Sequence, residues 1–128
     1  MNQNNIKQRK KTVLITEDQD SNFQLLEVLL EIWGINTLRA NCGQEAVDLC
    51  KSNKDIDLVL MDIQLPDFNG LVATKIIKKE NPELPIIAQT AYAIIGDREK
   101  ALEAGCDEYI SKPIKREQLF DLLQKFLE

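Results

Sequence analysis

Short apolar runs alternate with helix-length segments along this chain, and that alternation restricts the fold more than any other feature. The apolar runs are too short for buried helices and are bounded by polar residues or glycine, which is typical of strands. They lie at 12–16, 35–40, 58–61, 85–89 and 107–110. Segments with helical periodicity follow them, at 21–33, 43–52, 71–79, 93–104 and 116–127. The pattern predicts a three-layer α/β fold with five parallel strands and five crossover helices.

Differences among these segments predict where some of them lie. Residues 58–61 are continuously apolar, as expected of a central strand that is covered on both faces. Residues 35–40 alternate between apolar and polar, which indicates a strand near an edge of the sheet. The helix at 93–104 contains Gly96 and few large apolar residues, so we expect it to be interrupted there and weakly packed.

Length and composition exclude several classes of protein. Residues 1–11 are polar, basic and without periodicity, which predicts a disordered leader or linker before a single domain at 12–128. The net charge of −5 argues against a general nucleic-acid surface, and no apolar stretch approaches the roughly 18 residues of a membrane span. The absence of histidine excludes histidine triads and the usual zinc sites. We therefore expect a cytoplasmic domain with three reduced, unpaired cysteines.

Polar residues stand at the ends of four of the predicted strands. They provide three acids, one hydroxyl and one amine: Glu17, Asp18, Asp62, Thr90 and Lys112. Taken singly, each is more typical of a turn, a helix cap or a solvated surface. In parallel sheets, however, residues just past the carboxyl ends of strands converge on one crevice. The placement of this set after four different strands therefore favours a shared site.

The chemistry of the three acids predicts a bound cation. Two carboxylates about 4 Å apart repel by roughly 4 kcal/mol at an effective dielectric near 20. Magnesium prefers oxygen ligands and takes one or two carboxylates directly, so Asp18 and Asp62 are the predicted direct ligands and Glu17 a ligand through water; Mn²⁺ could substitute. With the ammonium of Lys112, the cation could neutralise a phosphoryl group in transit. Asp62 then has the position and chemistry of the nucleophile.

The chain resembles the receiver domain of bacterial two-component response regulators over residues 11–128. The matching segments are 13–18, 57–70, 90–93 and the one ending Ile110-Ser111-Lys112-Pro113. Residues 89–109 are most similar to receivers of hybrid sensor histidine kinases. The resemblance implies a doubly wound, flavodoxin-like sheet of order 2-1-3-4-5. It also implies that Asp62 is the phosphoacceptor, charged by a cognate histidine kinase or histidine phosphotransfer protein, in a domain that is not a turnover enzyme on external substrates.

The resemblance assigns roles to further residues. It implies that the backbone carbonyl of Gln64 is a third protein ligand of magnesium, and that Thr90 and Lys112 contact the phosphoryl group. Tyr109 matches the switch aromatic, which moves inward when Thr90 moves. The peptide bond between Lys112 and Pro113 is expected to be cis.

Other implications concern the lifetime of the phosphoryl group and its output. Gln64 and Tyr92 flank the route of the hydrolytic water and are expected to tune dephosphorylation. The surface of the fourth helix, fifth strand and fifth helix is the expected output face and the expected surface of any homodimer. The domain could act alone or at the cytosolic end of a membrane-bound hybrid kinase. Gln89 departs from the apolar residue common in this family and is expected to affect packing only.

Three rival interpretations explain the sequence less well. A phosphatase of the haloacid dehalogenase type needs an acid two residues after the nucleophile, where this chain has Gln64. A nucleotide- or flavin-binding module needs a glycine-rich loop after the first strand, where residues 17–22 contain no glycine. A receiver used only for docking has no need of the complete set of site residues that is present.

Overall fold

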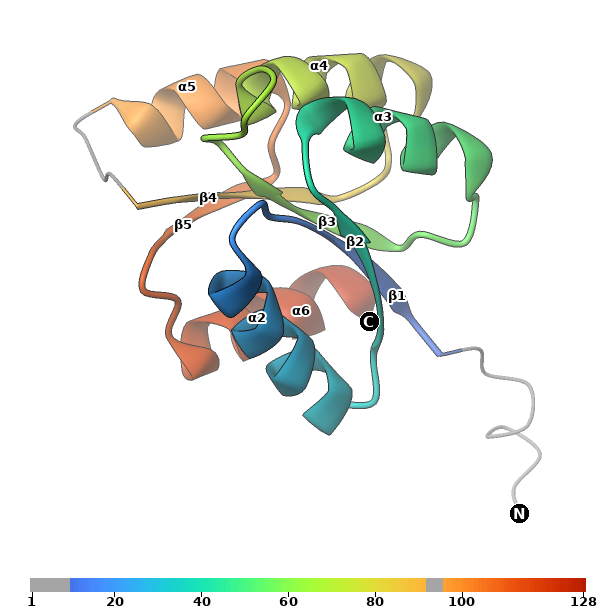
Figure 1. Cartoon of the computed structure of the whole chain (residues 1–128), viewed down its shortest axis with the longest axis vertical. Coiled ribbons are helices and arrows are strands. Elements are labelled where there is room, and N and C mark those ends of the chain that lie inside the picture. The colour runs from blue at the N-terminus through green and yellow to red at the C-terminus, as the bar shows by residue number, and fades with distance from the viewer. Residues whose placement is uncertain (1–9, 92–95) are drawn as a thin grey trace.

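A parallel five-stranded sheet lies between two layers of helices (Figure 1). The computed structural model describes residues 10–91 and 96–128. Its strands are β1 (Thr12–Thr16), β2 (Asn36–Ala40), β3 (Leu58–Asp62), β4 (Ile86–Thr90) and β5 (Glu108–Ser111). Its helices are α2 (Asp20–Ile32), α3 (Gly43–Ser52), α4 (Gly70–Glu80), α5 (Asp97–Ala104) and α6 (Arg116–Leu127). The strand order is β2-β1-β3-β4-β5, which confirms the predicted fold.

The two helical layers bury opposite faces of the sheet. Figure 1 shows α2 and α6 on one side and α3, α4 and α5 on the other. Side chains alternate between the faces along each strand, so Val13 and Ile15 pack towards α2 and α6 while Leu14 packs towards the other layer. Every residue of β3 is buried, which confirms the predicted central strand. β2 forms one edge and is only partly buried, also as predicted.

The structure describes the helix predicted at 93–104 from 97 onward. α5 starts at Asp97, directly after Gly96, whose φ of 91° is left-handed. A right-handed helix cannot run through a residue in that conformation, so α5 starts after Gly96. Residues 93–95 of the predicted helix lie outside the described residues. The predicted tuning residue Tyr92 lies outside the described residues, and so do residues 1–9 of the predicted leader.

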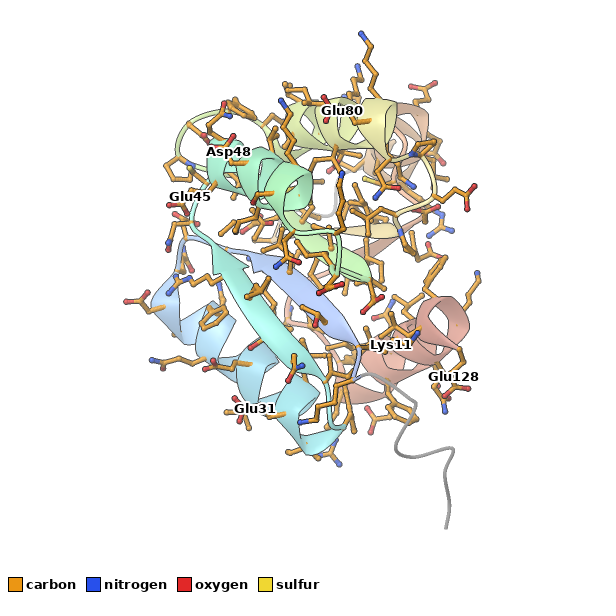
Figure 2. The ribbon with its side chains drawn as sticks, turned by 90° about the vertical axis from the view of Figure 1, so that its right-hand side faces the viewer. Lys11, Glu31, Glu45, Asp48, Glu80 and Glu128 are labelled. Atoms are coloured by element: carbon orange, nitrogen blue, oxygen red, sulfur yellow. The ribbon has the colours of Figure 1, made fainter. Side chains whose placement is uncertain are left out.

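The net negative charge of the chain is visible on its surface. Acidic side chains such as Glu31 on α2, Asp48 on α3 and Glu80 on α4 point outward from both helical layers (Figure 2). The three cysteines form no disulfide in this structure. All three are partly or fully buried, and burial raises the pKa of Cys50 and Cys106 to about 11. No helix in the described ranges is long and apolar enough to cross a membrane.

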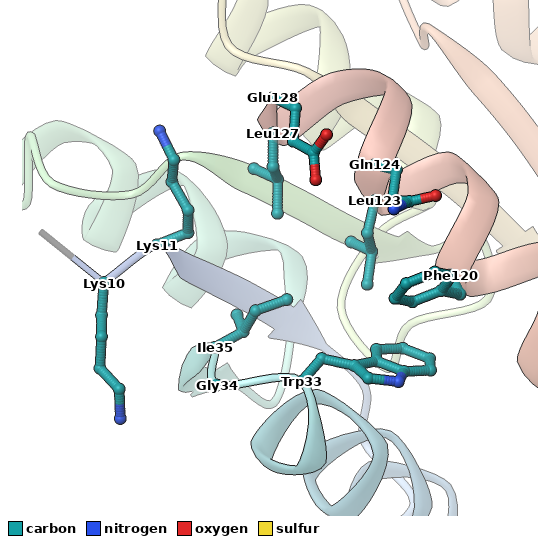
Figure 3. Close-up of a pocket in the computed structure, with 10 residues that line it drawn as sticks. All are labelled: Lys10, Lys11, Trp33, Gly34, Ile35, Phe120, Leu123, Gln124, Leu127 and Glu128. Carbon is teal, nitrogen blue, oxygen red and sulfur yellow. The ribbon is translucent and has the colours of Figure 1, made fainter. Parts of the chain in front are cut away.

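A groove of about 640 Å³ opens at the amino-terminal edge of the sheet, between the C-terminal ends of α2 and α6 (Figure 3). Trp33 and Phe120 pack in its wall with ring centroids 5.0 Å apart. Lys10 and Lys11 enter β1 beside it. The groove therefore lies at the end of the sheet opposite to the carboxyl ends of the strands.

The loop after β3 is tied to its surroundings by Asp67. The carboxylate of Asp67 accepts hydrogen bonds from the backbone N–H groups of Gly43 and Gln44, at 2.8 and 2.9 Å, and so caps α3 from a distant part of the chain. It also accepts one from Phe68, at 2.8 Å. Since α3 has no side-chain cap of its own, Asp67 holds the β3–α4 loop and the start of α3 together.

Replacing Asp67 by alanine should destabilise the domain by about 1 kcal/mol, the usual loss for a helix N-cap. Slight burial raises the pKa of Asp67, but hydrogen bonds from Gln44, Gly43 and Phe68 outweigh it and hold the pKa at about 2, below the ordinary 3.8. The folded-state pKa is therefore depressed, so the contribution is present above about pH 4 and is lost as pH falls towards about 2. Urea denaturation of wild type and Asp67→Ala, once above about pH 4 and once near pH 2, measures this contribution to the free energy of unfolding. The exposed Glu83→Ala is the control and should behave like wild type at both.

Candidate functional site

The register of the sheet brings the predicted site residues to one edge. β1 and β3 end almost level, since Thr16 pairs with Met61, and β4 continues the row, since Gln89 pairs with Asp62. The predicted acids, hydroxyl and amine stand at the last residue of a strand or within two residues after it: Glu17, Asp18, Asp62, Thr90 and Lys112. Their side chains come from four strands that are far apart in the sequence.

Lys112 forms a largely buried ion triad with two of the acids, Glu17 and Asp62. Its Nζ lies 2.7 Å from Glu17 Oε1 and 2.9 Å from Asp62 Oδ2. The Glu17 side chain is fully buried, and those of Asp62 and Lys112 are 6% and 16% exposed. The backbone of Lys112 is fixed too, because its N–H donates to the carbonyl of Thr90 at 2.7 Å. Charges held this far from water are weakly screened and strongly coupled.

Burial and pairing act in opposite directions on the ionisable groups of the triad. Burial raises the pKa of Asp62, although the ammonium of Lys112 and the N–H of Gln64 work against that rise. Burial works against the ammonium of Lys112, but hydrogen bonds to Glu17 and Asp62 outweigh it, so the pKa of Lys112 is raised. Lysine therefore stays charged, and it stabilises two carboxylates that would otherwise be buried without a counter-charge.

An acidic cluster faces a cleft beside the triad. Carboxylate oxygens of Glu17, Asp18 and Asp62 all lie within 4.8 Å of one another. Asp18 is exposed, and it lines a cleft of about 340 Å³ together with Asp62, Gln64 and Lys112. Three carboxylates and one ammonium leave a formal charge of −2. Oxygen-only ligands, two uncompensated negative charges and access from solvent fit a hard divalent cation.

Backbone N–H groups orient the acids of this cluster. Asp62 Oδ1 accepts from the N–H of Gln64 at 3.0 Å, while Oδ2 accepts from Lys112. Glu17 Oε2 accepts from the N–H of Gln19 at 3.2 Å, while Oε1 accepts from Lys112. Both buried carboxylates thus use one oxygen for the lysine and the other for a loop, which fixes their rotation.

Arg39 supports the acidic loop and was not predicted from the sequence. Its Nε donates to the backbone carbonyl of Glu17 at 3.1 Å, and its Nη1 lies 2.8 Å from Asp20 Oδ1. Its guanidinium stacks over the ring of Phe23, 4.6 Å from the centroid. The N–H of Glu17 donates to the carbonyl of Ala40, so the Glu17 peptide is held on both sides. An arginine in an alternating edge strand gives no sequence signal for this role.

Thr90 and Tyr109 lie on the face of the sheet that α5 covers. Thr90 is 3% exposed, and alternation along the strands places its side chain and that of Tyr109 on the face covered by α5. The Tyr109 hydroxyl is buried, without a hydrogen-bond partner among the described residues. Burial is the main cause that raises the pKa of Tyr109, and the negative charge of Asp97 raises it further. The Lys112–Pro113 peptide bond is cis.

Comparison with known proteins agrees with this geometry. A sequence model of the response regulator receiver domain matches residues 13–124. The chain therefore belongs to the receiver-domain family, and it is a receiver domain of two-component signalling. Receiver domains are signalling modules that interact with histidine kinases or phosphotransfer proteins, and the family binds Mg²⁺ in its active site.

Individual relatives cover almost the whole chain. The polar-differentiation response regulator DivK of Brucella anthropi is 41% identical over 119 residues, which are 91% of this chain and 96% of that protein. DivK of Brucella ovis is 42% identical with the same coverage. The receiver domain of the sensor histidine kinase PA1611 from Pseudomonas aeruginosa PAO1 is 35% identical, with a TM-score of 0.85 over 93% of this chain and 98% of that one. Its structure has a magnesium ion coordinated in the active site cleft.

Proposed function

We propose that Asp62 is the phosphoacceptor of this receiver and takes its phosphoryl group from a phosphohistidine of a cognate kinase or phosphotransfer protein. The observation that carries the proposal is the position of Asp62, which lies on the cleft, 2.9 Å from the only ammonium of the triad and within the acidic cluster. A carboxylate oxygen of Asp62 would form the bond to phosphorus as the bond from phosphorus to the histidine nitrogen breaks. That nitrogen keeps the electron pair.

Asp18, Asp62 and the backbone carbonyl of Gln64 would hold Mg²⁺, with Glu17 acting through water and Mn²⁺ as a substitute. When bound, the ion supplies positive charge beside the phosphoryl oxygens. Lys112 supplies the other positive charge and would exchange its bond to Asp62 for one to a phosphoryl oxygen. The chain catalyses only its own phosphorylation and dephosphorylation, and the donor brings the phosphoryl group.

The output proposed for this domain runs through Thr90 and Tyr109. The Thr90 hydroxyl would move to a phosphoryl oxygen, and the Tyr109 side chain would follow into the space that Thr90 leaves. This pair biases the surface of α5, β5 and α6 between two states. The same surface is the proposed site of homodimerisation, and Gln64 and Tyr92 are the proposed tuning residues for loss of the phosphoryl group. We place this activity in the cytoplasm, in a free domain or at the cytosolic end of a hybrid kinase.

Incubation with acetyl phosphate and Mg²⁺, followed by intact mass measurement, tests the proposal. The wild-type protein should gain one phosphoryl group, and Asp62→Asn should gain none, because an amide oxygen is a poor nucleophile. The matched control is Asp48→Asn, which removes an exposed acid on α3 and should react like wild type. A phosphoryl group that remains on Asp62→Asn would refute the assignment. Chelation of Mg²⁺ should abolish the reaction of the wild-type protein.

A further inference from the structure

Gln89 is the most anomalous side chain in the core. It is fully buried on β4, and neither its Oε1 nor its Nε2 has a hydrogen-bond partner among the described residues. An amide buried without partners destabilises the state in which it is unpaired, because it has lost its hydrogen bonds to water. Such groups are rare in native proteins, and each needs an explanation.

The sheet places Gln89 on the strand that the side chain of Lys112 crosses, and on the same face. Lys112 follows β5, while the carboxylate that it binds ends β3, so the lysine side chain must cross β4, which lies between them. It does so on the face of α2 and α6, since Lys112 is two residues past Ile110, which packs there. Gln89 points to the same face, two residues past Ile87, and pairs in register with both Asp62 and Ile110.

The ammonium of Lys112 has a third N–H donor that neither Glu17 nor Asp62 uses. A lysine ammonium carries three N–H donors, and two of them are used by Glu17 and Asp62. At rest the two acids hold the ammonium where it does not donate to the Gln89 amide. Once Lys112 gives up its bond to Asp62 the ammonium can move, and the amide oxygen can turn about its soft terminal torsion to accept from it. The amide oxygen of Gln89 is thus an unpaired acceptor on the strand crossed by Lys112. One of the present partners of Lys112 is Asp62, the proposed phosphoacceptor.

We propose that Gln89 is a positioning residue for Lys112, whose ammonium is accepted by the Gln89 amide oxygen once a phosphoryl group occupies Asp62. The amide is unpaired in the resting state and paired in the phosphorylated state. It therefore destabilises the resting state relative to the phosphorylated state. Gln89 thereby biases the domain towards the phosphorylated form. This inference rests on the proposed function, since it takes Asp62 as the phosphoacceptor.

Gln89→Met tests the inference, because methionine has a similar length and shape but no amide. The variant should unfold about 2–5 °C higher than wild type in the absence of ligands, since the unpaired amide is gone. Its affinity for beryllofluoride, which stands in for the phosphoryl group on Asp62, should fall about fivefold or more in the presence of saturating Mg²⁺. Its affinity for Mg²⁺ alone should not change, because Gln89 is not among the proposed ligands.

Thr16→Val is the matched control. The Thr16 hydroxyl is also fully buried and without a partner among the described residues, but it points to the opposite face of the sheet from Gln89. Its removal should raise the unfolding temperature and leave the affinity for beryllofluoride unchanged. An unchanged affinity in Gln89→Met, or an equal loss in Thr16→Val, would overturn the proposal and leave Gln89 as a packing residue.

Failure of the proposed function would look different. In that case the wild-type protein would bind beryllofluoride no better than Asp62→Asn does, whatever residue stands at position 89. If Gln89→Met does not fold, Gln89→Leu gives the same comparison with a shorter apolar side chain, and the same two outcomes decide it.

Discussion

Replacing Lys112 by methionine is expected to destabilise the metal-free domain by about 3 kcal/mol or more, the usual result of removing one partner of a buried ion pair. Methionine keeps much of the volume of the lysine side chain but leaves the carboxylates of Glu17 and Asp62 without a counter-charge. Both are almost fully buried, so water cannot replace the ammonium. Urea denaturation in the presence of a chelator measures the loss.

Added Mg²⁺ should restore part of that stability, because a cation that binds only the folded state stabilises it by mass action. The control is Lys78→Met, since Lys78 is equally buried, 14% exposed, and lies 2.7 Å from Asp107, far from the acidic cluster. This control should lose less stability, because its acid is 34% exposed, and Mg²⁺ should not restore it. Equal losses in the two variants would show that the triad is an ordinary ion pair.

Gly70→Ala is expected to destabilise the domain by about 3 kcal/mol and to slow phosphorylation of Asp62. A Cβ at Gly70 would collide with the backbone carbonyl oxygen of Asp62 and lie 3.0 Å from the Cα of Ile63. Backbone atoms cannot turn aside as a side chain can, so α4 and the end of β3 must move apart. The hydrogen bond from the Gly70 N–H to the Ile63 carbonyl, at 2.7 Å, would be strained as well.

A second glycine provides the comparison. Gly34 has a φ of 76°, but a Cβ there would meet nothing within 4 Å. Gly34→Ala should therefore lose only about 1 kcal/mol through backbone strain and should be phosphorylated at the wild-type rate. Denaturation and acetyl phosphate kinetics on the two variants separate strain from collision. If Gly70→Ala is no worse than Gly34→Ala in either assay, the close packing of α4 on β3 has no role in the site.

The convergence of the site could be predicted because it depends only on strand ends. Once the apolar runs are taken as parallel strands, Asp18, Asp62 and Lys112 must gather at one edge, whatever the details of packing. The strand order itself came from the family resemblance, since periodicity does not determine which strands are neighbours. Periodicity also could not show the left-handed conformation of Gly96, from which α5 begins in the described part of the chain.

Contacts between distant segments could not be predicted in the same way. Arg39 on β2 reaches the carbonyl of Glu17 after the neighbouring strand β1, and Asp67 caps a helix that begins 24 residues earlier. Gln89 was expected to affect packing alone, because a sequence does not show that a buried amide has no partner or that a lysine crosses above it. Each of these roles depends on which side chains meet in space.

The groove at the amino-terminal edge provides a natural optical probe. Trp33 is the only tryptophan of the chain, and its indole packs against Phe120 at the junction of α2 and α6. Its fluorescence will therefore report whether those two helices remain together, while the acidic cleft lies at the other end of the strands. A change in emission when Mg²⁺ or beryllofluoride is added would mean that the effect had travelled the length of the sheet, and not that the ligand had met the fluorophore.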